Sequence, residues 1–372
     1  PLSRLPAASS RPAAQAAEVG AVADSRRKAK AGPTHLYGRA DIELFDIRAP
    51  GNGYSSETVL FETRDPSGAV DSLVARLAPM PDVFPVFAEY DLTLQRKCMQ
   101  LVRADTDVPV PDVVHPEQDA SWLGTPFIVM RRVDGVAPLD VPPYVFGGWV
   151  MDATPEERAH MQHNAISVLV QLHEITPETH DLSWVTPRQG GDSALERLLA
   201  HERWYYEWAR EGDTYPLIER SLDWLEKHMP RDIPGVFSWG DARIGNMLWR
   251  DFEPVAVLDW EMATVGPREV DLAWMIFLHR FFQDMAERFE MPGLPDFMER
   301  DTLAATYEGL SGHTVAHLEW YEVFAALRFA IVSVRTTARS VAYGVQEKTA
   351  DPDDVIMFRN LLEQMMDGSY WT

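Results

Sequence analysis

Strand patterns and helix patterns occupy different parts of this chain, and that segregation restricts the fold more than any other feature. Between about residues 40 and 78, the alternating segments DIELFDIRAP and YSSETVLFET are separated by turn signals at 51–53 and 65–68. From residue 153 onward, apolar residues recur at helical spacing. Strands that precede a run of helices predict an α+β fold, with a small antiparallel sheet and a larger helical region.

The change of pattern also predicts the domain organisation. We expect an N-terminal lobe over residues 35–133, with a meander of three strands, a helix over 86–102 and a buried strand in TPFIVMRRVDG. A connector near Arg131–Asp134 leads to a C-terminal lobe over 134–372. Residues 1–34 are rich in Ala, Ser, Pro and Arg, which favours a disordered tail over a transit peptide.

The C-terminal lobe is expected to contain several helices and one hairpin. Helical periodicity covers residues 154–175, 193–212, 217–229 and 318–344. Thr154 followed by Pro155 is typical of a helix start. The segments NMLWRD and VAVLDW, joined by residues 252–254, predict the two strands of a hairpin.

Composition excludes several classes of function. The formal net charge of −23 argues against nucleic-acid binding, which needs a basic face. No apolar run approaches the roughly 18 residues that span a bilayer. Cys98 is the only cysteine, so one chain can form neither a disulfide framework nor a thiolate zinc site. The cysteine usage predicts a cytoplasmic protein, and the acidic charge is compatible with cationic small molecules.

Three polar residues stand out around the hairpin, namely Asp241, Asn246 and Asp259. Asn246 opens one strand and Asp259 ends the other, so the hairpin brings their side chains close together. A carboxylate and an amide oxygen make a hard site suited to Mg²⁺ that carries nucleotide phosphates. Asp241 can accept a proton from a substrate hydroxyl or orient that hydroxyl for attack.

The segments WGDARIGNMLW and VAVLDWEMATVGPREVDLAW resemble the signature of the aminoglycoside phosphotransferase and choline-kinase-like family. The similarity covers roughly residues 38–345, and it points to a branch with bacterial aminoglycoside-phosphotransferase-like proteins and kinase domains associated with acyl-CoA dehydrogenases. The resemblance implies a bilobal protein-kinase-like fold that uses ATP and Mg²⁺ to phosphorylate a hydroxyl group. It makes Asp241 the catalytic residue, and Asn246 and Asp259 the metal ligands.

Three further residues of this motif are expected to support the site. Glu261 would support the metal or the substrate. Asp271 resembles the helix-start Asp that anchors the catalytic loop through backbone amides, with capping of its own helix as the alternative. Trp239 stands where the family usually has His, and we expect it to pack behind the loop and support the strand that ends in Asp259.

Phosphate contacts are expected from the N-terminal lobe. In the turn RAPGNGYSS, backbone amides and the hydroxyls of Ser55 and Ser56 can approach phosphate oxygens. The family lysine is replaced by Arg76, a substitution that the resemblance tolerates in this branch. Arginine keeps the charge, and we expect Glu89 on the following helix to pair with it.

FIVMRRVDG resembles the strand and connector that hold adenine in the family. Backbone groups of Arg131 and Val133 would pair with the edge of the base, while Met130 lines the pocket. Because backbone makes these contacts, side-chain identity does not test them.

Substrate recognition has a weaker signal. Trp204 and Tyr205 lie near acidic residues, which suits a cationic or sugar-like substrate, although an ordinary amphipathic helix explains them better. Arg335, with Arg328 and Arg339 on the same predicted helix, suits a carboxylate or the phosphates of an acyl-CoA. The loop LDVPPYVFGGWV is long and aromatic enough to close over a site.

Three functions remain open on these grounds. The first is a kinase for an aminoglycoside-like or other small alcohol, and the second is a hydroxyacyl-CoA or hydroxy-acid kinase of the same fold. The third is a nucleotide-binding pseudokinase, favoured by the missing His and Lys. The preference for ATP or GTP and the oligomeric state are not encoded in these motifs.

Overall fold

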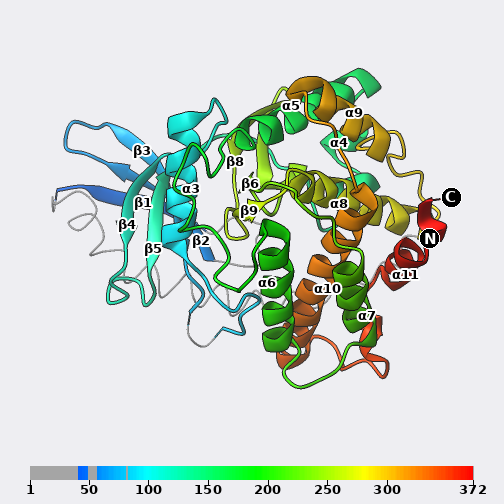
Figure 1. Cartoon of the computed structure of the whole chain (residues 1–372). Helices are drawn as coiled ribbons and strands as arrows, with labels where there is room; N and C mark the ends of the chain where they lie inside the picture. Colours follow the sequence, from blue (N-terminus) through cyan, green and yellow to red (C-terminus); the bar gives the residue numbers. More distant parts are fainter. Residues whose placement is uncertain (1–40, 49–56, 81–82, 372) are drawn as a thin grey trace. The chain divides into compact units, whose positions relative to one another are not determined.

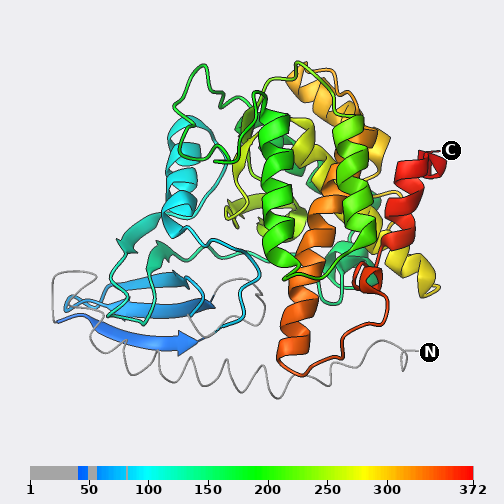
Figure 2. The same ribbon diagram turned by 60° about the horizontal axis from the view of Figure 1, so that its bottom comes forward.

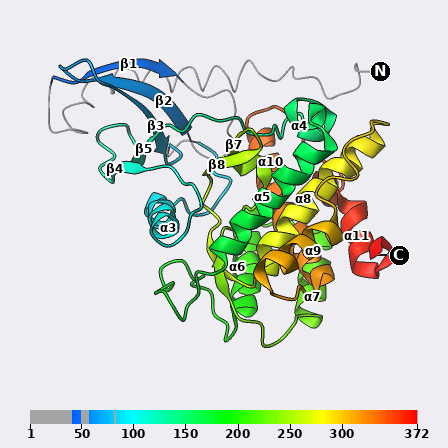
Figure 3. The same cartoon turned by 90° about the horizontal axis from the view of Figure 1, so that it is seen from above.

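The computed structural model describes residues 41–48, 57–80 and 83–371 (Figures 1, 2 and 3). These residues divide into two compact units. We call the first the sheet unit; it contains the described residues up to Arg96, then Asp112–Arg132 and Arg339–Glu347. The second, the helical unit, contains Lys97–Pro111, Val133–Ala338 and the residues from Lys348 onward. Each unit is assembled from separate segments of the chain.

An antiparallel five-stranded sheet forms the sheet unit, with strand order β1-β2-β3-β5-β4 (Figure 1). Its strands are β1 (Glu43–Arg48), β2 (Glu57–Arg64), β3 (Val70–Leu77), β4 (Val113–Glu117) and β5 (Phe127–Arg131). The expected meander is confirmed as β1 to β3, and the buried strand is β5. The Asp65 carboxylate accepts from the amides of Ser67 and Ala69, which explains the tight turn between β2 and β3. Strand β4 was not predicted.

Alternate residues of β2, β3 and β5 form the core of the sheet unit. They are Val59, Phe61, Leu73, Ala75, Leu77, Phe127 and Val129. Arg76 lies between two of these positions on β3, opposite Thr58 of β2 and Ile128 of β5. The sheet therefore holds Arg76 in a defined register and half-buried.

The helix after β3 begins later than expected. Helix α3 spans Leu92–Asp105, because the Asp91 side chain accepts from the amides of Thr93 and Leu94 and so caps its first turn. Glu89 precedes the helix and is exposed, so its predicted place on the helix is wrong. Within the described residues, no ion pair joins Glu89 to Arg76.

The helical unit contains most of the helices and two short strand pairs (Figure 3). Its longer helices are α5 (Pro155–Leu172), α6 (Ala194–Ala209), α7 (Pro216–Lys227), α8 (Glu269–Arg288), α9 (Arg300–Ser311), α10 (Leu318–Ala342) and α11 (Arg359–Asp367). Shorter helices are α4 (Trp149–Asp152) and the 3-10 turns η3 (Tyr144–Phe146), η4 (Ile244–Asn246), η5 (Pro352–Val355) and η6 (Ser369–Trp371). Thr154 and Ser193 start α5 and α6 with capping boxes, which confirms the predicted start of α5.

Two strand pairs position the polar motif. Strand β7 (Met247–Arg250) pairs with β8 (Glu253–Val257), which confirms the predicted hairpin. Strand β6 (Val236–Ser238) pairs with β9 (Thr264–Gly266). Residues 239–246 connect β6 to β7, and we call them the catalytic-loop segment after the role that the resemblance implies. Across the described residues, none of the helices has the length and apolarity needed to cross a membrane.

Candidate active site

The catalytic-loop segment begins with a turn that requires glycine. Gly240 has a φ of +87°, a left-handed conformation that favours glycine. A Cβ atom placed on Gly240 would lie 1.9 Å from the carbonyl oxygen of Met262. Only glycine therefore lets the segment turn this close to the chain that follows β8.

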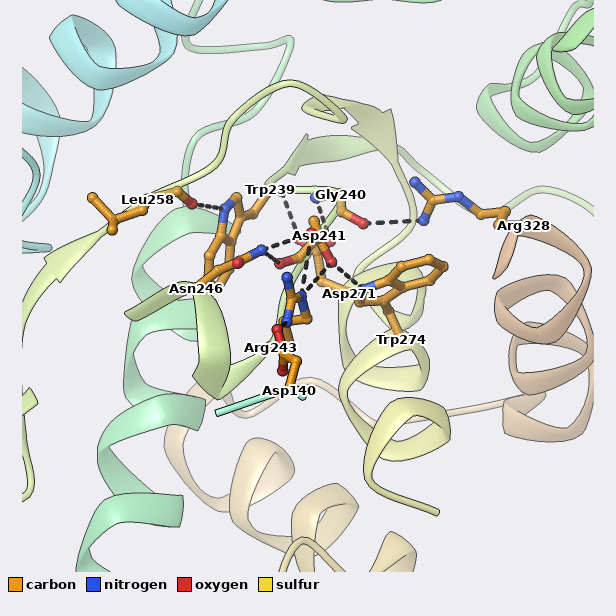
Figure 4. A network of polar contacts seen from close by, with 10 residues as sticks. All are labelled: Asp140, Trp239, Gly240, Asp241, Arg243, Asn246, Leu258, Asp271, Trp274 and Arg328. Atoms are coloured by element: carbon orange, nitrogen blue, oxygen red, sulfur yellow. Dashed lines mark hydrogen bonds and ion pairs between the residues drawn. The ribbon is translucent and has the colours of Figure 1, made fainter. Parts of the chain in front are cut away.

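The Asp271 side chain of α8 holds this turn in place through hydrogen bonds (Figure 4). Its side chain is fully buried, and it accepts hydrogen bonds from the amide of Trp239 at 2.7 Å and the amide of Gly240 at 2.8 Å. The Ser238 hydroxyl donates to the same carboxylate at 2.8 Å. No side chain caps the start of α8, so of the two roles expected for Asp271 the structure shows anchoring.

The environment of Asp271 favours its charged form. Burial alone would raise the pKa of this carboxyl, but the hydrogen bond and charge of His173, with the donors of Gly240 and Ser238, hold the pKa below its ordinary value. His173 lies at the end of α5, with Nε2 at 3.2 Å from Asp271 and Nδ1 at 2.7 Å from the Tyr307 hydroxyl. His173 thus helps to hold the Asp271 carboxylate in place. The sequence did not reveal this role, because His173 reads there as an ordinary helix residue.

Asp241 lies in the catalytic-loop segment and receives three side-chain donors (Figure 4). Trp274 Nε1 donates to Oδ1 at 2.7 Å, Asn246 Nδ2 donates to Oδ2 at 2.7 Å, and Arg243 Nε lies 3.1 Å from Oδ1. The Asp241 side chain keeps 15% exposure. Its carboxylate is therefore oriented by protein donors and still reaches solvent.

Arg243 links Asp241 to the segment before η3. Its Nη1 forms a hydrogen bond and ion pair with Asp140, which lies in the loop predicted to close over a site (Figure 4). Burial of the guanidinium lowers its pKa, but the charges of Asp241, Asp140 and Asp259 outweigh burial and raise the pKa of Arg243 above its ordinary value. The loop and the catalytic-loop segment are thus joined through one permanent cation.

Asn246 and Asp259 supply the oxygen donors that suit Mg²⁺. Asn246 is buried, and its amide nitrogen donates to the backbone and the carboxylate of Asp241, so its amide oxygen is the remaining candidate ligand. The Leu258 amide donates to the backbone oxygen of Asn246 at 2.9 Å, which places Asp259 one residue beyond this contact. Asp259 adopts a φ of +63°, and its charge acts on Arg243.

The donor set fits a cation that is shared with a ligand. In the described part of the chain, no group of three or more His, Cys, Asp or Glu side chains converges to hold a metal by itself. One carboxylate and one amide oxygen suit Mg²⁺ that keeps water or phosphate oxygens as its other ligands. Glu261, two residues beyond Asp259, is half-buried, and its supporting role stays a prediction.

Trp239 packs as expected from the sequence. Its indole is fully buried, and Nε1 donates to the Leu258 backbone oxygen at 2.9 Å. Its ring lies 5.9 Å from that of Trp260, at the other side of Asp259. Trp239 therefore supports both neighbours of Asp259 from the interior and does not project as a ligand-facing group.

The predicted nucleotide residues belong mainly to the sheet unit. Met130 is buried on β5, and the Arg131 amide donates to Asp112 O at 2.9 Å. The contact of Arg131 with the base stays a prediction. The Arg131 side chain pairs with Asp71 at 2.8 Å. Val133 lies within the predicted connector and begins the second segment of the helical unit. Ser55 and Ser56 lie outside the described residues.

The predicted substrate residues are largely engaged within the protein. Tyr205 is buried and stacks on Trp208, while Trp204 is 36% exposed. Arg335 is 2% exposed, pairs with Glu211 at 2.6 Å and covers the ring of Trp208. The aromatic helix α6 therefore has the core face of an amphipathic helix, and Arg335 serves an internal ion pair.

Sequence reasoning missed the side chains that surround Asp241 from distant segments. These residues are Asp140, Arg243, Trp274 and Arg328, of which Arg328 was expected in a different role, on a substrate carboxylate or acyl-CoA phosphate. Arg243 had a usable signal, because it lies two residues after Asp241 in the motif. Trp274 lies 33 positions from Asp241, Arg328 lies 88 from Gly240, and Asp140 lies 103 from Arg243. These pairings depend on tertiary packing.

The model of the phosphotransferase enzyme family matches residues 46–308. Among sequence relatives, Acyl-CoA dehydrogenase family member 10 of Mus musculus is 27% identical over 243 residues, covering 65% of this chain and 20% of that protein. The probable acyl-CoA dehydrogenase IBR3 of Arabidopsis thaliana is 25% identical over 307 residues, covering 77% and 35%. The chain thus spans about a fifth to a third of these relatives.

Solved structures share the fold at low sequence identity. A Ralstonia eutropha protein named "putative aminoglycoside phosphotransferase" has a TM-score of 0.65 and 19% identity, with 93% of this chain and 98% of that chain covered. A mutant of the aminoglycoside phosphotransferase APH(4)-Ia, in complex with AMP-PNP and hygromycin B, has a TM-score of 0.55 and 16% identity, with 93% and 99% covered. These similarities confirm the kinase-like α+β fold.

Proposed function

The chain belongs to the phosphotransferase enzyme family, and we propose that it transfers the γ-phosphate of ATP, with Mg²⁺, to a hydroxyl group of a small molecule. The observation that carries the proposal is the Asp241 carboxylate. It is held by three side-chain donors, one of them Asn246, and it remains partly exposed. The charge of Asp259 acts on Arg243, another of these donors. That combination suits phosphoryl transfer, in which positioning and electrostatics provide most of the catalysis.

Residues in and around the catalytic-loop segment have separate roles in this reaction. Asp241 accepts a hydrogen bond from the substrate hydroxyl and takes its proton as the hydroxyl attacks. Asn246 and Asp259 would hold Mg²⁺, which would neutralise negative charge on the phosphate oxygens. Arg243 keeps Asp241 oriented through Nε, and Asp271 keeps the turn at Trp239 and Gly240 in place.

Nucleotide binding is proposed for residues of the sheet unit. Arg76 would contact phosphate oxygens, with Glu89, Ser55 and Ser56 in support. Met130, with the backbone of Arg131 and Val133, would contact the base. A half-buried arginine held in register by two neighbouring strands supports a fixed cationic contact at this position.

The acceptor is proposed from two classes. A neutral or cationic alcohol is consistent with the net charge of −23 and with the hygromycin B complex of a structural relative. A hydroxyacyl-CoA or hydroxy acid is consistent with relatives named as acyl-CoA dehydrogenase family members. Arg335 is paired internally, so it adds no support to the second class. We therefore place the general small-molecule alcohol first.

ATP consumption in the presence of Mg²⁺ tests the proposal. The purified chain is screened against simple alcohols, aminoglycosides and hydroxyacyl-CoAs, and we expect phosphorylated product from one class. A thermal shift with and without Mg-ATP runs in parallel, and binding at 100 times Kd adds about 2.7 kcal/mol of stability. Stabilisation by Mg-ATP without turnover would favour the pseudokinase. The absence of both stabilisation and turnover would refute a nucleotide-dependent function.

A further inference from the structure

Trp274 connects Asp241 to the interior of the helical unit. It lies three residues after Asp271 on α8, so the same helix presents both side chains to the catalytic-loop segment. Its indole is 2% exposed, and Nε1 donates to Asp241 Oδ1 at 2.7 Å. This length is at the short end for a nitrogen donor, as expected for a charged acceptor.

Arg328 of α10 packs against the same indole (Figure 4). Its guanidinium carbon lies 4.7 Å from the centroid of the Trp274 ring, and Nη1 donates to the Gly240 backbone oxygen at 3.2 Å. Arg328 Nε lies 3.3 Å from the Glu202 carboxylate of α6, and both side chains are buried. One cation therefore contacts three groups around the catalytic-loop segment.

The cation changes what Trp274 can do for Asp241. A guanidinium over an aromatic face draws electron density from the ring, so the indole N–H becomes a stronger donor. Burial limits the screening of this effect by solvent and salt. The hydrogen bond to Asp241 is consequently stronger and more directional than an isolated indole would make it.

We propose that Trp274, held and polarised by Arg328, is a positioning residue that fixes the Asp241 carboxylate for phosphoryl transfer. The inference rests on the proposed function, because it assigns a task only if Asp241 meets the acceptor hydroxyl. Glu202 completes the arrangement by orienting Arg328 from α6. The alternative is that Trp274 merely fills the core, and the two roles depend on different parts of the side chain.

Trp274→Phe separates these roles, because phenylalanine keeps an aromatic ring and removes the N–H. We measure turnover of Mg-ATP, with water as acceptor where no better acceptor is found. The positioning role predicts that kcat falls about tenfold while KM changes less than about twofold. In an Asp241→Asn background, the same substitution should have no further effect on kcat.

Arg328 provides the matched pair of variants. Arg328→Lys keeps a positive charge near the ring and should retain most of kcat, whereas Arg328→Gln should lower kcat to the level of Trp274→Phe. This pair decides the outcome if Trp274→Phe does not fold. Equal kcat in wild type, Trp274→Phe and Arg328→Gln would overturn the positioning role.

The indole ¹H–¹⁵N resonance of Trp274 reports the contact without turnover. The resonance is assigned by its loss in Trp274→Phe, and it should shift in Asp241→Asn and in Arg328→Gln. A wild-type chain that shows this dependence but transfers no phosphate would refute the proposed function. If the chain is active but the chemical shift of the Trp274 indole resonance does not change in Asp241→Asn, only the positioning role is refuted.

Discussion

The catalytic-loop segment and the β3–β5 strand pair hold their polar groups in opposite ways. Asp241 of the segment and Asp271, which anchors the segment from α8, are each fixed by several donors. On the strand pair, main-chain pairing sets the register, and the predicted ligand contacts are one arginine and a few backbone groups. Chemistry that depends on placed carboxylates should therefore be more sensitive to mutation than chemistry that depends on strand backbone.

Asp241→Ala should have the largest effect. Loss of the carboxylate that meets the acceptor hydroxyl should lower kcat by about 10³-fold, within the usual range for a general base. The measurement is steady-state turnover of Mg-ATP with the acceptor found by screening. Asp296→Ala, at an exposed carboxylate of the same unit, serves as control and should match wild type. If Asp241→Ala retained wild-type turnover, Asp241 would have no catalytic role, and the segment would not be more sensitive to mutation than the strand pair.

Asp271→Asn should come next, and its effect should appear mainly in stability. The amide keeps one acceptor oxygen but presents an N–H₂ group to buried donors, so the free energy of unfolding should fall by about 3 kcal/mol. Urea denaturation of this variant and of Asp296→Asn measures the difference. If the two variants unfold at the same urea concentration, the anchor does not stabilise the segment.

Arg76→Gln tests the sheet unit. Loss of one cationic phosphate contact should raise KM for ATP about tenfold with a smaller change in kcat, and Arg76→Lys should recover part of the affinity. Initial rates over a range of ATP concentrations measure both parameters. A loss of kcat as large as that of Asp241→Ala would show that the two regions are equally sensitive, contrary to the comparison.

The smallest effect is a pH dependence of stability from His279. Burial lowers the pKa of His279 to about 4, and its Nδ1 accepts from the Tyr144 hydroxyl while Nε2 donates to Leu294 O. Between about pH 6.5 and 4 the unfolded chain binds a proton that the folded chain does not, so stability rises with pH in this window. The expected loss is about 1 kcal/mol between pH 6.5 and 5.5.

His279→Gln isolates this contribution. The variant should lose less stability than wild type over the same pH interval when both are followed by urea denaturation. Parallel curves for the two proteins would assign the pH dependence to other groups.

Much of the fold was predictable because its signals are local. Alternation and turn residues marked the meander of β1 to β3, and two strand-like segments joined by residues 252–254 marked the β7–β8 hairpin. Strand β4 was missed because VVHPE is short and contains Pro116, which weakens a strand pattern. The start of α3 was placed too early because apolar spacing extends before Asp91, whereas the Asp91 cap decides where the helix begins.

The site was predictable only as far as its motif reached. The hairpin drew attention to Asn246 and Asp259, the resemblance assigned roles to them and to Asp241, and these roles stay predictions. Trp239 was correctly expected behind the loop. The Asp140–Arg243 pair joins residues 103 positions apart, and Arg328 meets Gly240 across 88 positions. Such contacts arise from helix packing, which no local pattern encodes.

The bonds from Asp271 to the amides of Trp239 and Gly240 have a consequence for time scales. An amide hydrogen that a buried carboxylate accepts can exchange with solvent deuterium only when that bond opens. Because the carboxylate belongs to α8 and is itself inaccessible, this opening requires the helix start and the turn to separate together. The exchange rates of the Trp239 and Gly240 amide hydrogens would therefore measure how often the catalytic-loop segment separates from α8.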